Sequence, residues 1–72
     1  MNSEVILLNW DWTAEVVGRM HVAAITGKQL ASEAGISNTY LSTVLRNKKG
    51  NDMTRQRIVA ALERLEQRQA KQ

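Results

Sequence analysis

Apolar side chains recur at helical spacing in four stretches of the chain. In the first stretch, a cap at Asn9 or Asp11 would start a helix that runs to about residue 23 or 24. Successive apolar positions there are separated by four, four and three residues, which places them on one face of a helix. These positions are Trp12, Val16, Met20 and Ala23.

Two short helices are predicted in the middle of the chain. Thr26 can accept the backbone N–H of Gln29, and the Gln29 side chain can reach back to Thr26, which makes a capping box. Gly35 suits the left-handed turn that ends a helix, and Ser37 can cap the next helix only two residues later. Their inward positions are small or branched: Leu30, Ala31, Ala34, Ile36, Leu41, Val44 and Leu45.

A fourth helix is predicted to follow a basic loop at residues 46–51. Its cap is Asn51, Asp52 or Thr54, and the helix extends to about residue 68. Beyond residue 65 no apolar stripe continues, so we expect this end to fray. Its apolar face comprises Ile58, Ala61, Leu62 and Leu65.

Residues 1–8 are predicted to form an N-terminal arm, and residues 9–72 a single domain. The run from Val5 to Leu8 is apolar without helical spacing, so a short extended segment is favoured over a helical extension. The sequence contains no proline, and good helix formers are plentiful. The expected fold class is therefore all-α, with four helices.

The composition excludes several kinds of chemical site. The 72 residues include no cysteine and a single histidine, which excludes disulfides, thiolate metal sites and histidine-rich zinc sites. We expect no cofactor, no metal and no small-molecule substrate, and no nucleophile–base pair supports an enzyme. No apolar run is long enough to span a bilayer, so a cytoplasmic location without a membrane partner is expected.

The net charge of +3 is unevenly distributed. Residues 1–25 carry a net charge of −2, residues 26–50 a net charge of +3, and residues 51–72 a net charge of +2. A basic middle and tail are typical of a protein that binds nucleic acid, although mild basicity alone is weak evidence.

Residues 27–46 have the pattern that a helix-turn-helix requires, because two amphipathic helices meet at small residues around a glycine turn. The segment resembles the helix-turn-helix of the phage-repressor and Cro type, also called the xenobiotic-response-element type. The resemblance covers about residues 10–65 and implies a small phage- or plasmid-type repressor whose helix 38–46 lies in the major groove of DNA. The matching residues are Leu30, Ala31, Gly35, Ile36, Leu41 and Val44.

Two departures from that family stand out. Its members often pair an arginine on the first helix with a glutamate at the end of the recognition helix, and the matching residues here are Met20 and Leu45. Apolar packing is therefore expected in place of a buried ion pair. Many repressors also dimerise through a fifth helix, whereas the fourth predicted helix is expected to be the last one here. A homodimer is still expected on paired half-sites, joined by the arm 1–8 or by the last helix.

Exposed polar residues on the predicted third helix are the candidates for base recognition. With Asn38, the first residue after the cap Ser37, taken as position i, positions i, i+1, i+4 and i+5 form one strip, which holds Asn38, Thr39, Ser42 and Thr43. The resemblance implies that bases are read mainly by Asn38, Thr39 and Thr43. Asparagine can bind adenine, and threonine methyl groups can contact thymine, so an A·T-containing half-site is predicted.

Phosphate contacts are predicted around this strip. They come from cations and hydroxyl groups on both helices and from the basic loop, and the N-terminus of the helix at 27 can receive a phosphate as well. For Tyr40, a phosphate contact and packing against the rim of the core both remain open. The predicted phosphate contacts are Lys28, Ser37, Tyr40, Ser42, Arg46, Lys48 and Lys49.

The sequence thus predicts a sequence-specific transcriptional regulator that binds double-stranded DNA. Two alternatives remain. A protein-interaction module would use the same polar face on a protein partner, and its binding would not depend steeply on salt. A non-specific architectural DNA binder would lose its site to an excess of unrelated duplex.

Overall fold

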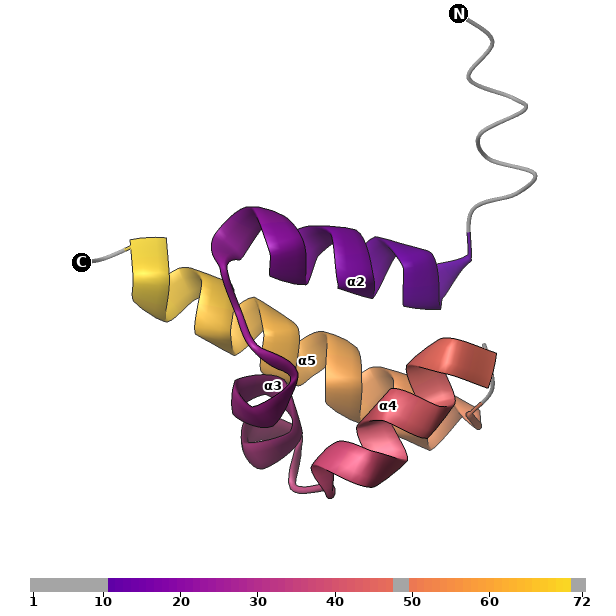
Figure 1. Ribbon diagram of the computed structural model, residues 1–72. Coiled ribbons are helices and arrows are strands. Elements are labelled where there is room, and N and C mark those ends of the chain that lie inside the picture. Colours follow the sequence, from indigo (N-terminus) through magenta and orange to yellow (C-terminus); the bar gives the residue numbers. More distant parts are fainter. Residues whose placement is uncertain (1–10, 48–49, 71–72) are drawn as a thin grey trace, which may run out of the picture.

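The computed structural model describes residues 11–47 and 50–70, and within these ranges the chain forms four helices and no strand (Figure 1). The predicted all-α class is therefore confirmed for the described residues. The arm 1–8 and the loop residues Lys48 and Lys49 lie outside them. No helix in the described ranges is both long and apolar enough to cross a membrane. The helices are α2 (Trp12–Ala23), α3 (Gly27–Ala34), α4 (Asn38–Asn47) and α5 (Asp52–Ala70).

Each helix begins at a side chain that accepts a backbone N–H in its first turn, as the sequence predicts. Asp11 caps α2 by accepting from the N–H of Ala14 at 2.9 Å. Thr26 accepts from the N–H of Gln29 at 3.1 Å, and the Gln29 side chain accepts from the N–H of Thr26 at 2.8 Å, so the capping box is complete. The caps of α4 and α5 are Ser37 and, among the three candidates, Asn51.

Helices α2 and α3 end in the same way, with one residue in the left-handed region followed by an isoleucine. Ala24 has φ 55° and Gly35 has φ 74°. The next amide in each case donates to a carbonyl five residues back, from Ile25 to Met20 and from Ile36 to Ala31, which is the Schellman motif. The glycine was predicted to end its helix in this way, whereas alanine at the corresponding position of α2 was not.

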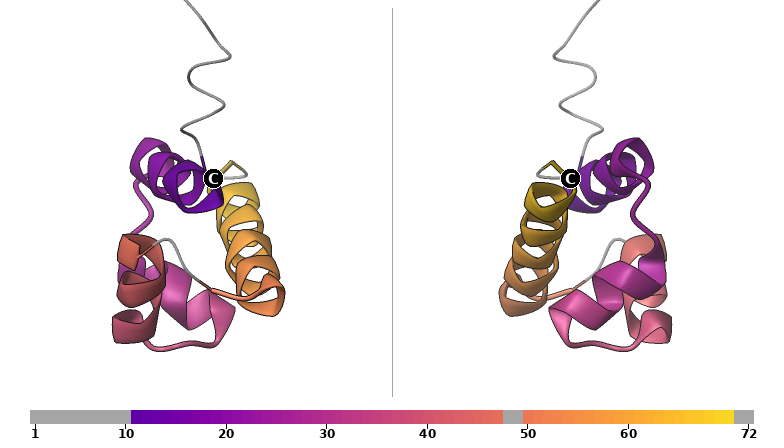
Figure 2. Two further views of the ribbon diagram at one scale, coloured as in Figure 1. Left: turned by 90° about the vertical axis from the view of Figure 1, so that its right-hand side faces the viewer. Right: turned by 90° about the vertical axis from the view of Figure 1, so that its left-hand side faces the viewer.

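Helix α5 is the longest of the described helices, and it packs against both α2 and α3 (Figure 2). Its Ile58 and Leu62 have no exposed surface, and neither does Leu30 of α3. Burying one such side chain contributes roughly 1.5–3 kcal/mol. The small residues Ala31 and Ala61 are also buried, which allows α3 to lie close to its neighbours. The packing thus fixes α3, and with it the turn that leads into α4.

The apolar pattern was nearly right on α2 and incomplete on α5. Val16 is 1 % exposed as predicted, whereas the adjacent Val17, which lies off this stripe, is 48 % exposed. The fraying predicted beyond Leu65 is wrong, because α5 remains helical to Ala70. Ion pairs from its last turns to α2 and α3 hold this end, as described below.

Candidate nucleic-acid interface

Helix α4 has one buried and one exposed face. Leu41 and Val44 are 1 % and 3 % exposed and belong to the core, while Leu45 is partly buried against it. The predicted reading residues lie on the other side of the helix. Asn38, Thr39, Ser42 and Thr43 are all exposed, so the structure places these four side chains together on one accessible strip of α4.

Two hydroxyl groups on α4 already have partners inside the protein. Thr43 donates its hydroxyl to the carbonyl of Thr39 at 3.0 Å, which holds the Thr43 side chain in one arrangement. The Tyr40 hydroxyl lies 3.3 Å from Oγ1 of Thr54, and this contact joins α4 to α5. The contact with Thr54 supports the packing role of Tyr40. Because 45 % of Tyr40 is exposed, a phosphate contact stays a prediction.

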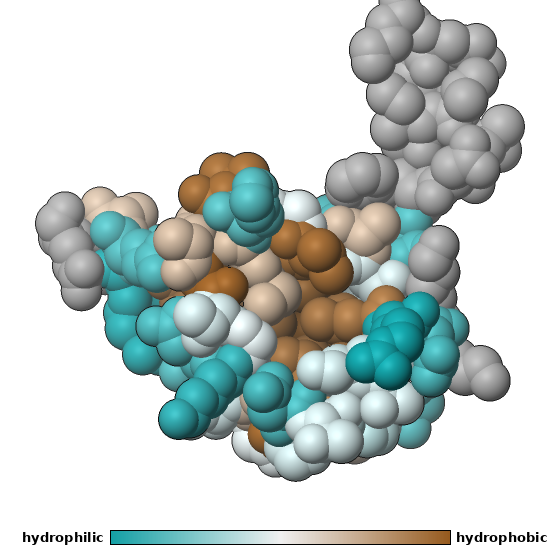
Figure 3. Space-filling model, in the orientation of Figure 1, coloured by the Kyte–Doolittle hydropathy of each residue, from teal (hydrophilic) through white to brown (hydrophobic). Residues whose placement is uncertain are grey.

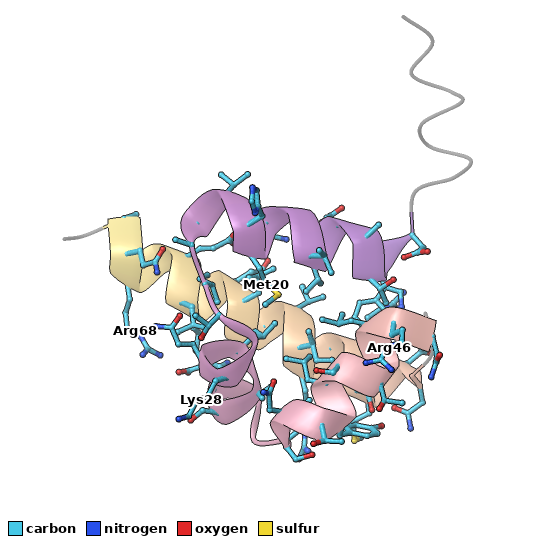
Figure 4. The ribbon with its side chains drawn as sticks, in the orientation of Figure 1. Met20, Lys28, Arg46 and Arg68 are labelled. Atoms are coloured by element: carbon cyan, nitrogen blue, oxygen red, sulfur yellow. The ribbon has the colours of Figure 1, made fainter. Side chains whose placement is uncertain are left out.

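Basic side chains without a carboxylate partner lie on α3 and α4. Within residues 11–47 and 50–70, neither Lys28 nor Arg46 forms a salt bridge, whereas Arg19, Arg64 and Arg68 do. Lys28 is exposed in the first turn of α3, and Arg46 is exposed near the end of α4. In Figure 4 the labelled Lys28 lies on α3, to the left of α4, and Arg46 lies near the far end of α4. They therefore flank the neutral strip.

The single carboxylate between residues 26 and 50 is that of Glu33, and it faces two arginines of α5. Arg64 donates to it at 2.8 Å, and Arg68 donates at 2.6 Å. Hydrogen bonds from Arg64 and then Arg68 lower the pKa of Glu33 below its ordinary value of 4.5 and outweigh the opposing effect of desolvation. The negative charge is thus neutralised on the side of α3 that faces α5, and α3–α4 has no free carboxylate among its described residues.

A second arginine–glutamate contact joins α2 to α5. Arg19 donates through Nε to Glu66 at 3.0 Å and through Nη2 to the other carboxylate oxygen. This hydrogen bonding raises the pKa of Arg19 above its usual value. The alternating charges of Arg64, Glu66 and Arg68 are typical, by sequence alone, of a solvated helix face. These residues instead connect α5 to α2 and α3, and an i, i+4 pattern cannot reveal partners 31 to 47 residues away.

The positions where many repressors carry a buried ion pair are apolar here. Met20 and Leu45 are both partly buried and pack against the core cluster. Figure 4 labels Met20 in the region between α2 and the helices below it. The expected replacement of an ion pair by apolar packing therefore agrees with the burial of both residues.

The hydropathy of the surface agrees with an uncharged strip that lies between cations. In Figure 3 the lower face, over the first turns of α4, is pale, which is the colour of hydropathy close to neutral. Hydrophilic atoms border this face at the positions that Figure 4 labels Lys28 and Arg46, while brown apolar atoms lie above it, below α2. An exposed neutral surface between cations suits a ligand with polar base edges flanked by phosphates.

Comparison with models of protein families found no match, and neither did comparison with curated proteins or with solved structures. The interface is therefore defined by its geometry. Of the predicted phosphate contacts, Ser42 is exposed on the strip itself, and Lys28, Ser37 and Arg46 are exposed near it. Lys48 and Lys49 fall outside the described residues.

Proposed function

We propose that this protein is a sequence-specific DNA-binding regulator of transcription, a binding protein rather than an enzyme. In this proposal α3 and α4 form a helix-turn-helix of the phage-repressor type, and α4 lies in the major groove while α3 braces it. The observation that carries the proposal is the exposed, uncharged strip of α4 between two cations that have no carboxylate partner. A cytoplasmic location is part of this proposal.

The charge distribution supports this orientation. DNA phosphates repel carboxylates, so a groove-binding surface needs cations at its edges and no free acid between them. On α3–α4 the carboxylate of Glu33 is held by Arg64 and Arg68, and Lys28 and Arg46 remain available for phosphates. Lys48 and Lys49 follow α4 directly in the sequence and add to the same charge.

The uncharged strip supports specific contacts. Asn38 offers a donor and an acceptor for adenine, and Thr39 and Thr43 each carry a methyl group that can meet thymine. Because the Thr43 hydroxyl donates to the Thr39 carbonyl, its free interactions are a methyl group and an oxygen lone pair. The strip therefore favours a half-site that contains A·T pairs.

Two copies of the domain are proposed to bind together. A single reading helix provides few base contacts, and dimers on half-sites about 34–36 Å apart are the usual solution. The extents of 35 × 29 × 17 Å are small enough for two domains to bind adjacent half-sites on one duplex. Sedimentation of a chain that lacks residues 1–8 tests the arm as the joint, because a truncated chain that dimerises as well as the full chain excludes it.

The function is tested by selecting bound duplexes from a random pool and then comparing variants on the selected site. Asn38→Ala should weaken binding to the selected duplex by about 1–3 kcal/mol and change binding to unrelated duplex much less. Gln67→Ala, which removes an exposed amide on α5, is the matched control and should change neither.

The same experiment separates the alternatives. If no duplex is enriched from the pool and the binding of the pool DNA does not depend on salt, the polar face serves a protein partner instead. If Asn38→Ala weakens specific and unrelated duplexes equally, the protein binds DNA without reading its sequence through this residue.

A further inference from the structure

The first residue of α3 lies directly beside the first residue of α4. A Cβ atom placed on Gly27 would be 3.1 Å from Oδ1 of Asn38. This distance is shorter than a comfortable carbon–oxygen contact, so any larger residue at position 27 requires the Asn38 side chain to move by a few tenths of an ångström. The glycine and the candidate base-reading residue are thus coupled, although they are separated by a full helix and a turn.

The backbone does not require glycine at this position. Gly27 begins α3 with a φ outside the left-handed region, and alanine is the better helix former. Gly35 is the opposite case, because its φ is 74° and a Cβ there would meet nothing within 4 Å. Glycine at position 35 is explained by conformation, and glycine at position 27 by the space it leaves for Asn38.

We propose that Gly27 is a specificity-determining position that acts through Asn38. This inference rests on the proposed function. Without a side chain at position 27, the Asn38 oxygen lies beside the start of α3, and in this proposal the amide meets a base from that position. Two hydrogen bonds to one adenine need donor–acceptor distances of about 2.7–3.2 Å and near-linear angles, so a displacement of a few tenths of an ångström weakens both.

The decisive variant is Gly27→Ala, compared with wild type on the selected duplex and on the three duplexes that change the base pair recognised through Asn38. We expect the preference for the selected pair to fall at least fivefold. Affinity for unrelated duplex should stay the same, and the thermal midpoint should be unchanged or higher. In an Asn38→Ala background, Gly27→Ala should cause no further change in preference, because the coupling has lost its partner.

Other roles for Gly27 give different results. If the new methyl group only obstructs a phosphate, Gly27→Ala weakens all duplexes equally and does so in the Asn38→Ala background as well, which overturns the inference. Gly35→Ala serves as the control, since it should lower the thermal midpoint while leaving base preference unchanged. A lost preference in that variant would show that any disturbance of the turn has the same effect, which also overturns the inference.

A second readout does not involve DNA. The side-chain amide resonances and the χ1 coupling of Asn38 should shift in Gly27→Ala and stay constant in Gly35→Ala. If the Asn38 side chain is unchanged in Gly27→Ala, the inference is wrong whatever the binding data show. If wild type selects no duplex, the proposed function fails first and the inference falls with it, whereas normal selection with unaltered preference in Gly27→Ala refutes the inference alone.

Discussion

Opposite substitutions at the two left-handed helix ends should change stability in opposite directions. Ala24, with φ 55° and ψ 39°, and Gly35, with φ 74° and ψ 30°, occupy equivalent places after α2 and α3, and both are exposed. An L-residue in this region costs about 1–2 kcal/mol relative to glycine. Glycine also lowers the free energy of unfolding by about 0.4–1 kcal/mol, because it makes the unfolded chain more flexible. Ala24→Gly should therefore stabilise the protein by about 0.5–1 kcal/mol, and Gly35→Ala should destabilise it by about the same amount.

For a domain of this size, 1 kcal/mol corresponds to a shift of about 4–8 °C in the thermal midpoint. Thermal unfolding followed by far-ultraviolet circular dichroism measures both shifts, and urea unfolding gives the free energies. Ala60→Gly in the middle of α5 is the matched control, because the same substitution at a helical φ should lower stability by about 1 kcal/mol. A lower midpoint for Ala24→Gly would refute the left-handed end of α2, and an unchanged midpoint for Gly35→Ala would refute that of α3.

Two further predictions concern charged residues. Arg64 and Arg68 lower the folded-state pKa of Glu33, so its ion pairs stabilise the folded state above the ordinary value of 4.5 and cease to do so as the pH falls through the lowered pKa. Glu33→Gln should therefore be less stable than wild type at neutral pH, and unfolding curves of the two proteins should converge in strong acid; a difference that persists there would show that Glu33 acts by packing. Lys28→Ala should weaken binding to all duplexes about equally and reduce the salt slope by roughly one unit. An unchanged slope would place Lys28 outside the interface.

The helix starts were predictable because their determinants are local. Asp11, Thr26 and Ser37 each accept from an N–H group three residues away, and this relation is visible in the sequence. The end of α2 was approximately placed, but the left-handed conformation of Ala24 was not, because alanine rarely adopts it. The parallel between residues 24–26 and 35–37, a small residue, isoleucine and a hydroxyl cap, was the signal that could have indicated it.

Some parts of the candidate site were likewise predictable from local sequence, and others were not. The exposed strip of α4 was predictable because helical periodicity separates Asn38 and Thr43 from Leu41 and Val44. The contacts of Arg64 and Arg68 with Glu33 were not predictable, and neither was the proximity of Gly27 to Asn38, since both depend on how separate helices pack. The continuation of α5 past Leu65 was missed for the same reason: Arg68, in its last turn, binds a residue of α3.

The central claim is that α4 recognises a DNA sequence, and a competition measurement tests it most directly. The protein is bound to its selected duplex at physiological salt and challenged with increasing amounts of unrelated duplex of the same length. We predict that the selected duplex is bound at least about 10³-fold more tightly than the competitor. We also predict that both affinities fall steeply as salt rises. Equal affinities for the two duplexes would contradict the claim.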